Sequence, residues 1–204
     1  MNQIKEIKID NQIWMVENLN VGEFSNGETI QEAKTSKEWA LARKAKSPAW
    51  CYYKFDPENG RKYGRLYNWY AVNDYRGLAP KGWHIPTMTE WEELINCLGG
   101  IYYAGKKMKS KEGWKSKEGL QEYALGDNES GFTALPGGCL SDGVIFKDIE
   151  KGGYWWSSTD YNSGDALAQL KAMGCYVLYI SHFVSRNVNY KSRGLSVRCI
   201  KDPI

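Results

Sequence analysis

Several features that would point to a function are scarce or missing in this sequence of 204 residues. No apolar run approaches the roughly 18 residues that a helix needs to span a bilayer, so the sequence predicts no transmembrane segment. Two histidines, His84 and His182, are little material for acid–base catalysis. Five cysteines are an odd number, and none stands in a Cys-x-x-Cys or Cys/His cluster with metal-ligand spacing. The pattern favours neither a catalytic centre nor a bound metal or cofactor.

An excess of charge of one sign is also lacking. Lys and Arg number 27 against 24 Asp and Glu, which gives a formal net charge of +3. Nucleic-acid binding calls for a segregated basic face, so nucleic acid is not an expected partner. The first residues, MNQIKEIKIDNQIW, contain no apolar core of a signal peptide. The chain as given is therefore predicted not to be addressed for secretion, with a removed leader left open as an alternative.

Aromatic residues and glycine are abundant instead. The chain holds 9 Trp, 14 Tyr and 5 Phe beside 21 Gly. Its 42% hydrophobic and 25% charged residues match globular proteins and exclude a disordered or fibrous chain. The length fits one domain, since domains usually take about 100–200 residues. We expect residues 1–204 to form a single loop-rich domain held by small aromatic clusters.

The hydrophobic pattern of the first half predicts a hairpin, a helix and a turn. Apolar residues at 4, 7 and 9 alternate with polar ones before an Asp-Asn pair, and an apolar run follows at 13–15, which is typical of a hairpin. Residues 31–46 are rich in helix formers, with Trp39 as an anchor and Pro48 as a stop. Residues 56–60 (DPENG) predict a turn between two strands.

A second helix has the clearest signal. Thr87 and Glu90 form a capping box, and apolar residues then recur at helical spacing through position 98, where two glycines end the helix. Residues 101–153 predict loops with short strands, and residues 154–200 predict several strands separated by glycines.

Long aromatic-rich strings resemble the Fibrobacter succinogenes major paralogous domain. They run in family order from about residue 9 to 202, so the resemblance covers nearly the whole chain. The strings are QIWMVENLN (12–20), YGRLYNWYAV (63–72), APKGWHIPT (79–87) with the Glu-Trp pair at 90–91, NESGF (128–132), LPGG (135–138), GYWWSST (153–159) and SVRC (196–199).

The resemblance implies an α+β, C-type-lectin-like fold, in which two helices flank small twisted antiparallel sheets and much of the chain is loop. Formylglycine-generating enzymes and the target proteins of diversity-generating retroelements share that fold. Many family members are cell-surface or secreted proteins of Bacteroidetes, so the resemblance implies a cell-surface, secreted or virion-associated location. It also marks residues 154–200 as a candidate variable ligand-binding region.

The residues between the C-terminal motifs have the composition of a paratope. Tyr supplies rigid contact area at low entropic cost, while Asn and Ser supply adaptable hydrogen bonds. Leu167, where the family usually has Trp, and Cys175 depart from the family pattern. We expect a non-enzymatic module that binds an extracellular protein or glycan through Tyr161, Asn162, Leu167, Gln169, Lys171, Tyr176, Leu178, His182, Phe183, Ser185, Asn187, Asn189, Tyr190 and Arg193.

Other interpretations stay beside this one. The tryptophans at 69, 83, 91, 155 and 156 are expected in the core rather than on a sugar-binding platform. His84 is expected to be structural, and His182 to lie on a contact surface. Acidic turns at 56–59 and 127–129 are candidates for a structural calcium, against solvated turns.

Two further functional classes remain as alternatives. A copper oxidase of the formylglycine-generating type would need a cysteine pair such as Cys175 and Cys199, but its motif context is missing. A structural or assembly component of a cell surface or phage tail would form an oligomer. A disulfide between Cys51 and Cys199 is implied by analogy with many lectin folds.

Overall fold

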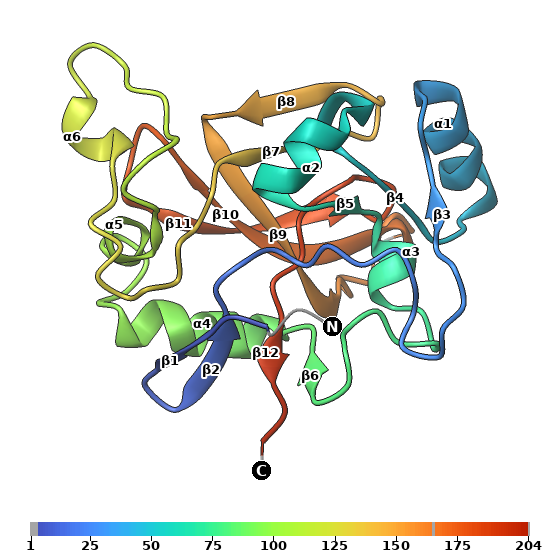
Figure 1. Ribbon diagram of the computed structural model, residues 1–204, viewed down its shortest axis with the longest axis horizontal. Helices are drawn as coiled ribbons and strands as arrows, with labels where there is room; N and C mark the ends of the chain where they lie inside the picture. The colour runs from blue at the N-terminus through green and yellow to red at the C-terminus, as the bar shows by residue number, and fades with distance from the viewer. Residues whose placement is uncertain (1–3, 165, 204) are drawn as a thin grey trace.

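The computed structural model describes residues 4–164 and 166–203. In this part of the chain, short helices surround several small sheets joined by irregular segments (Figure 1). The helices are α1 (Ser36–Ala45), α2 (Pro57–Tyr63), α3 (Trp69–Val72), α4 (Met88–Cys97), α5 (Ala104–Met108) and α6 (Gln121–Ala124), with 3₁₀ turns η1 (Tyr53–Phe55) and η2 (Ala168–Leu170). The strands are β1 (Glu6–Ile9), β2 (Gln12–Met15), β3 (Gln31–Glu32), β4 (Ala49–Cys51), β5 (Leu66–Tyr67), β6 (Trp83–His84), β7 (Gly137–Leu140), β8 (Phe146–Ile149), β9 (Gly152–Asp160), β10 (Lys171–Leu178), β11 (Val184–Tyr190) and β12 (Ile200–Lys201).

One sheet joins the two ends of the chain. The predicted N-terminal hairpin is confirmed: β1 and β2 pair antiparallel, with Ile9 opposite Gln12. The last strand, β12, lies between β2 and β6, and Ile200 pairs with both Trp14 and His84 (Figure 1). Segments almost 200 residues apart in sequence are thereby held side by side.

The main sheet has the order β11-β10-β9, with antiparallel pairing throughout. Successive residues of a strand point to opposite faces, and β9 uses this alternation to serve two cores. Trp155 is buried with α4 and Phe132, whereas Trp156 is buried with Tyr67 on the other side. The sequence-based assignment of these tryptophans to the core is confirmed.

A buried arginine connects the last motif to the first. Arg198 has no exposed surface and rests 4.5 Å from the centre of the Phe132 ring. Its guanidinium donates to Oδ1 of Asn18 and to the main-chain oxygens of Met15, Val16 and Phe132. Burial lowers the pKa of Arg198 to about 9, since a charge without a paired carboxylate is costly in the interior.

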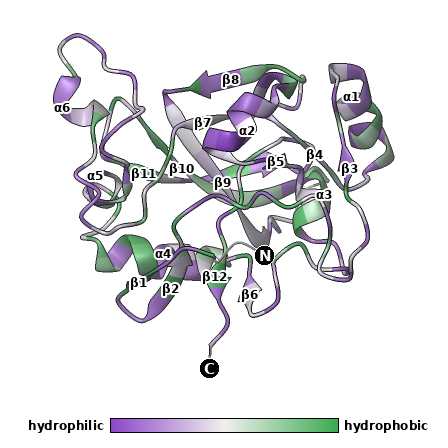
Figure 2. Cartoon of the chain, in the orientation of Figure 1, coloured by the Kyte–Doolittle hydropathy of each residue, from purple (hydrophilic) through white to green (hydrophobic). Residues whose placement is uncertain are grey.

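The two ten-residue helices follow their capping signals. Thr87 and Glu90 form the predicted capping box of α4, which buries Trp91 and Leu94 among other apolar residues. Figure 2 shows hydrophobic and hydrophilic residues alternating along this helix. The first helix is shorter than predicted: it begins at Ser36 after the Thr35 cap, and β3 occupies positions 31–32 instead.

The predicted turn at 56–60 is wrong, because these residues start the helix α2. Asp56 accepts a hydrogen bond from the main-chain nitrogen of Glu58, and Pro57 occupies the first helical position. An acidic cap followed by Pro is a helix-start signal, and here it outweighs the turn-like composition.

The expectation of antiparallel sheets fails at one place, since β3 and β4 pair in parallel.

The cysteines form no disulfide within the described chain. Cys51 lies on β4 in a cluster with Trp39, whereas Cys199 lies in the cluster of Trp156, and both are free and buried. The predicted disulfide between them is therefore wrong, because the two residues belong to different cores.

No helix of the described residues is long and apolar enough to cross a membrane.

Candidate functional site

The hairpin of β10 and β11 presents two different faces. Cys175 and Val177 point toward α4, in the same buried cluster as Trp91. Alternate residues point the other way, where Gly174 lies opposite Asn187 and Tyr176 opposite Ser185. This second surface, called the amide face below, brings together six of the predicted site residues, namely Tyr176, Leu178, Ser185, Asn187, Asn189 and, from the turn after β11, Arg193.

A reciprocal pair of side-chain amides forms the centre of the amide face. Nδ2 of Asn187 donates to Oδ1 of Asn189 at 3.1 Å, and Nδ2 of Asn189 donates back to Oδ1 of Asn187 at 3.0 Å. Both amides lie over Gly174, whose missing Cβ would meet the carbonyl oxygen of Trp155 at 2.5 Å. Only glycine fits there, so the amide pair sits on bare backbone.

Two tyrosines flank the amide pair. Tyr176 on β10 stacks on Tyr154 of β9, with ring centres 5.4 Å apart. Tyr154 is buried and donates its hydroxyl proton to Oδ2 of Asp148 at 2.7 Å. Burial and this carboxylate raise the pKa of Tyr154. The half-buried Tyr176 therefore rests on a partner whose hydroxyl is already engaged.

Arg193 supplies an uncompensated positive charge. Its Nη1 donates to Oδ1 of Asn189 at 2.6 Å and its Nη2 approaches the sulfur of Cys139 at 3.4 Å. Its Nε is buried without a hydrogen-bond partner, and Arg193 forms no ion pair with a carboxylate among the described residues. The amide face thus offers one cation, amide donors and acceptors, and an aromatic ring on a rigid sheet.

The other predicted residues fall into two separate groups. One group surrounds the start of β10, where the main-chain nitrogen of Tyr161 bonds to the oxygen of Lys171. Lys171 lies opposite Tyr190, with its Nζ 5.8 Å from the centre of that ring. The second group is the β10–β11 turn with His182 and Phe183. The members of the first group are Tyr161, Asn162, Leu167, Gln169, Lys171 and Tyr190.

Two predicted contact residues have a supporting position instead. Asn189 is 2% exposed and holds Arg193 and Asn187. His182 is half-buried, with its ring 5.2 Å from Tyr123 and its Nε2 buried without a partner among the residues described. The paratope-like composition between the C-terminal motifs predicted contact roles for both residues, but Asn187 and Arg193 cover Asn189, and Tyr123 packs against His182.

Sequence reasoning missed three residues that complete the amide face. Tyr154 stands in the GYWWSST motif, inside the candidate variable region but not among the predicted contact residues. Asp148 on β8 and Cys139 on β7 come from another two-stranded sheet. No local signal marks Asp148 or Cys139, because only the packing of β7 and β8 against β9 brings them to Tyr154 and Arg193.

The remaining candidates for chemistry are engaged elsewhere. His84 is structural in position: its two ring nitrogens lie 2.8 Å from Glu90 and 2.8 Å from Asp202. Trp83, expected in the core, is only half-buried.

Over residues 4–164 and 166–203, no three His, Cys, Asp or Glu side chains gather as a metal-binding group. In the two acidic turns, Asp56 and Asp127 each accept a main-chain N–H two residues ahead.

Cys175 and Cys199 do not form a reactive pair. Cys175 lies under α4 and Cys199 in the opposite core, and both side chains are buried. Burial raises the pKa of both thiols, which disfavours the thiolate that copper or an oxidant would meet.

The comparisons with known proteins give one match. The model of the Fibrobacter succinogenes major domain matches residues 7–201. No curated protein and no solved structure matches the chain. The matched segment contains every string that carried the sequence resemblance and almost every element in Figure 1. The chain belongs to the Fibrobacter succinogenes major domain family.

Proposed function

We propose that this protein is a non-enzymatic binding module, with a C-type-lectin-like arrangement, that recognises an extracellular protein or glycan through the amide face. The observation that carries this proposal is the uncompensated Arg193 beside the Asn187–Asn189 amide pair and the stacked Tyr176. Ligand surfaces combine a rigid aromatic anchor with adaptable hydrogen-bonding groups, and this face supplies both on strands rather than on loops.

The residues beneath the amide face also support this proposal. Gly174, Tyr154 and Asp148 lie beneath the half-buried side chains of this face. Substitutions at Tyr176, Ser185 or Asn187 would therefore change the surface without removing the sheet. Such a division suits a face that varies among gene copies, as in a retroelement target, on a protein displayed at a cell surface or virion.

Population sequencing of codons 154–200 tests the variable part of the proposal. Amino-acid changes are expected to concentrate at Tyr176, Ser185 and Asn187, while Gly174 and Arg198 stay unchanged. An even distribution of changes along these codons would contradict a diversified face, and would favour one fixed partner.

A binding experiment tests the face itself. The chain is applied to a glycan array and to a panel of purified surface proteins, beside a Tyr176→Ala/Asn187→Ala variant. We expect bound ligands to lose at least about tenfold in affinity in the variant, because hot-spot truncation costs about 2 kcal/mol or more. Tyr75→Ala is the matched control, since Tyr75 is 94% exposed and lies outside the amide face. Equal binding by all three proteins would overturn the assignment.

A further inference from the structure

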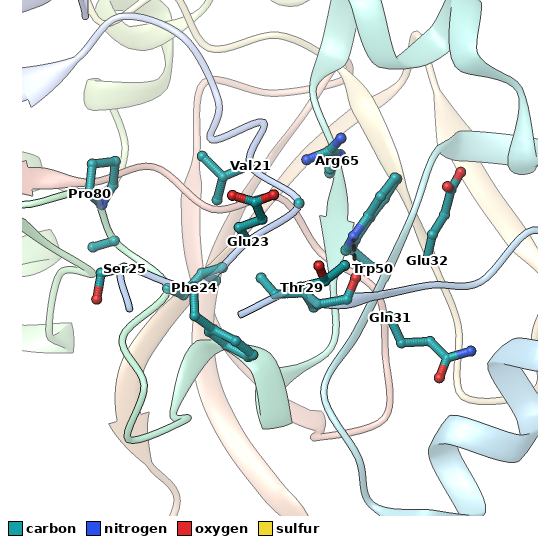
Figure 3. Close-up of a pocket in the computed structure, with 14 residues that line it drawn as sticks. Val21, Glu23, Phe24, Ser25, Thr29, Gln31, Glu32, Trp50, Arg65 and Pro80 are labelled. Carbon is teal, nitrogen blue, oxygen red and sulfur yellow. Dashed lines mark hydrogen bonds between the residues drawn. The ribbon is translucent and has the colours of Figure 1, made fainter. Parts of the chain in front are cut away.

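A pocket of about 850 Å³ lies away from the amide face and none of the predicted site residues lines it. It opens between residues 21–25, 29–32 and 78–80, with Trp50 and Arg65 from β4 and the segment before β5. Figure 3 shows the Arg65 guanidinium beside the Trp50 ring, with Thr29 and Phe24 toward the middle of the pocket and Pro80 at the far side. Neither the motifs nor the composition predicted this site.

Arg65 is held in one orientation. Its guanidinium carbon lies 3.7 Å from the centre of the Trp50 ring. A Cβ at Gly22 would lie 3.0 Å from Nη1, so the backbone of Gly22 lies close to the guanidinium. Trp50 is fixed in turn, since its indole nitrogen donates to the oxygen of Ile30 at 3.1 Å. A guanidinium stacked on a fixed indole ring in this way is pre-organised for a planar, two-point partner.

The charge of Arg65 has no carboxylate partner among the described residues. Its Nε is buried without a hydrogen bond, its Nη2 lies 3.5 Å from the Tyr52 hydroxyl, and a further side-chain hydrogen bond joins Arg65 to Tyr67. Two carboxylates nevertheless line the same pocket, Glu23 and Glu32. In Figure 3 they stand on the two sides of the Arg65–Trp50 stack. Glu32 is 3.8 Å from the Nζ of Lys34, and Glu23 enters no ion pair within the described chain.

This charge pattern selects the ligand class. The planar fork of Arg65 matches a carboxylate, but a purely anionic ligand would also face two glutamates. A ligand that carries both a carboxylate and an ammonium group satisfies both signs. Val21, Pro80 and Leu78 add an apolar wall. We propose that this pocket binds a zwitterionic α-amino acid, with its carboxylate on Arg65, its ammonium group on Glu23 and an apolar side chain against that wall.

Three matched probes test the proposal on the full chain by isothermal titration calorimetry. L-Leucine carries both charges, 4-methylpentanoate lacks the ammonium group, and isopentylamine lacks the carboxylate. We expect saturable binding of leucine or of another apolar amino acid, with each single-charge analogue at least about tenfold weaker, because it lacks one charge-assisted pair. Equal binding of 4-methylpentanoate and leucine, or no binding by leucine or any other apolar amino acid, would overturn the proposal.

Variants then locate the binding. Glu23→Gln leaves the Arg65–Trp50 stack intact, and Arg65→Lys keeps the charge while removing the planar fork. Each is expected to weaken leucine binding at least tenfold, with an unchanged melting temperature for Glu23→Gln. Arg61→Lys is the control, because Arg61 is exposed on α2 and paired with Glu58. Unchanged affinity in Glu23→Gln and Arg65→Lys would overturn the proposed site. Tyr176→Ala, which alters the amide face, is expected to bind leucine with unchanged affinity, so the two sites are tested separately.

Discussion

Oδ1 of Asn18 accepts hydrogen bonds from both Nε and Nη2 of Arg198, at 3.2 and 2.8 Å. The same oxygen accepts the indole N–H of Trp155 at 2.9 Å. One amide oxygen thus joins the first motif of the chain to the last motif and to the main sheet. Because the guanidinium is fully buried and also serves three main-chain oxygens, it acts as a structural cation rather than a ligand site.

Arg198→Met should therefore destabilise the protein strongly. Methionine fills much of the volume but removes the arginine donors from three carbonyl oxygens and leaves Asn18 Oδ1 with the Trp155 N–H alone, and each buried unsatisfied group costs about 1–3 kcal/mol. We expect a loss of about 3–5 kcal/mol in the free energy of unfolding, because several buried acceptors lose their donor at once. Urea denaturation followed by tryptophan fluorescence measures it; a change below 1 kcal/mol would show that the network contributes little.

The bridge from Glu90 through His84 to Asp202 should make stability depend on pH. Burial alone would lower the pKa of His84, but its hydrogen bonds to the two carboxylates raise it overall. A raised pKa means that the stabilisation is complete below the unfolded value of about 6.5 and disappears as the pH rises through the folded value. We expect the wild-type melting temperature to fall above pH 6.5 relative to that of His84→Gln. Parallel curves for the two proteins would contradict this linkage.

Lys109 should have the opposite pH dependence. Its side chain has no exposed surface, and its Nζ donates to the main-chain oxygens of Tyr123 and Ser181 at 2.7 and 2.8 Å. Burial lowers its pKa to about 7 from 10.5. The unfolded chain then binds the extra proton between these values, so stability should rise as the pH rises from about 7 to 10. Lys109→Met is expected to lack this rise, which chemical denaturation at pH 7, 8.5 and 10 measures.

Thiol counting tests the absence of disulfides. Of the five free cysteines, Cys97 is exposed and the other four are buried. A thiol reagent should modify one cysteine in the native protein and five after denaturation without a reductant. A count of three after denaturation would instead reveal one disulfide, and Cys51→Ser would show whether Cys51 takes part in it.

Gly174→Ala should disrupt the amide face from below. The added Cβ would lie 2.5 Å from the carbonyl oxygen of Trp155, which is main chain and cannot swing aside. Overpacking of a rigid site typically costs about 1–3 kcal/mol, and the Asn187–Asn189 pair should shift as β9 and β10 separate. Gly143→Ala is the control, since its nearest neighbours lie 3.9 Å away. Hydrogen exchange of the β10 amides compares the two variants; equal protection would contradict the expected strain.

Local signals predicted the elements that depend on neighbouring residues. The hairpin of β1 and β2 follows from alternation around a turn, and α4 follows from its capping box and apolar spacing. The same kind of reasoning failed at Pro57, where two local signals competed, and at β3, whose partner β4 lies well downstream. A strand of two residues has too little pattern of its own to be recognised.

Only part of the candidate site could be predicted from the sequence. Tyr176, Ser185 and Asn187 were predicted as contact residues from composition and the family resemblance, whereas their place on one face follows from the strand register, which puts Tyr176 opposite Ser185. The positions of Tyr154, Asp148 and Cys139 under that face depend on contacts between separate sheets.

The sequence by itself determined the family, the two capped helices, the N-terminal hairpin and the aromatic core, because motifs, caps and periodicity are local properties. Only the tertiary structure decided that Arg198 lies buried on Asn18, that Cys51 and Cys199 stay apart, and that Arg65 lies unpaired over Trp50. These relationships join residues distant in sequence, and their energies come from desolvation and packing, which exist only once the chain has closed around them.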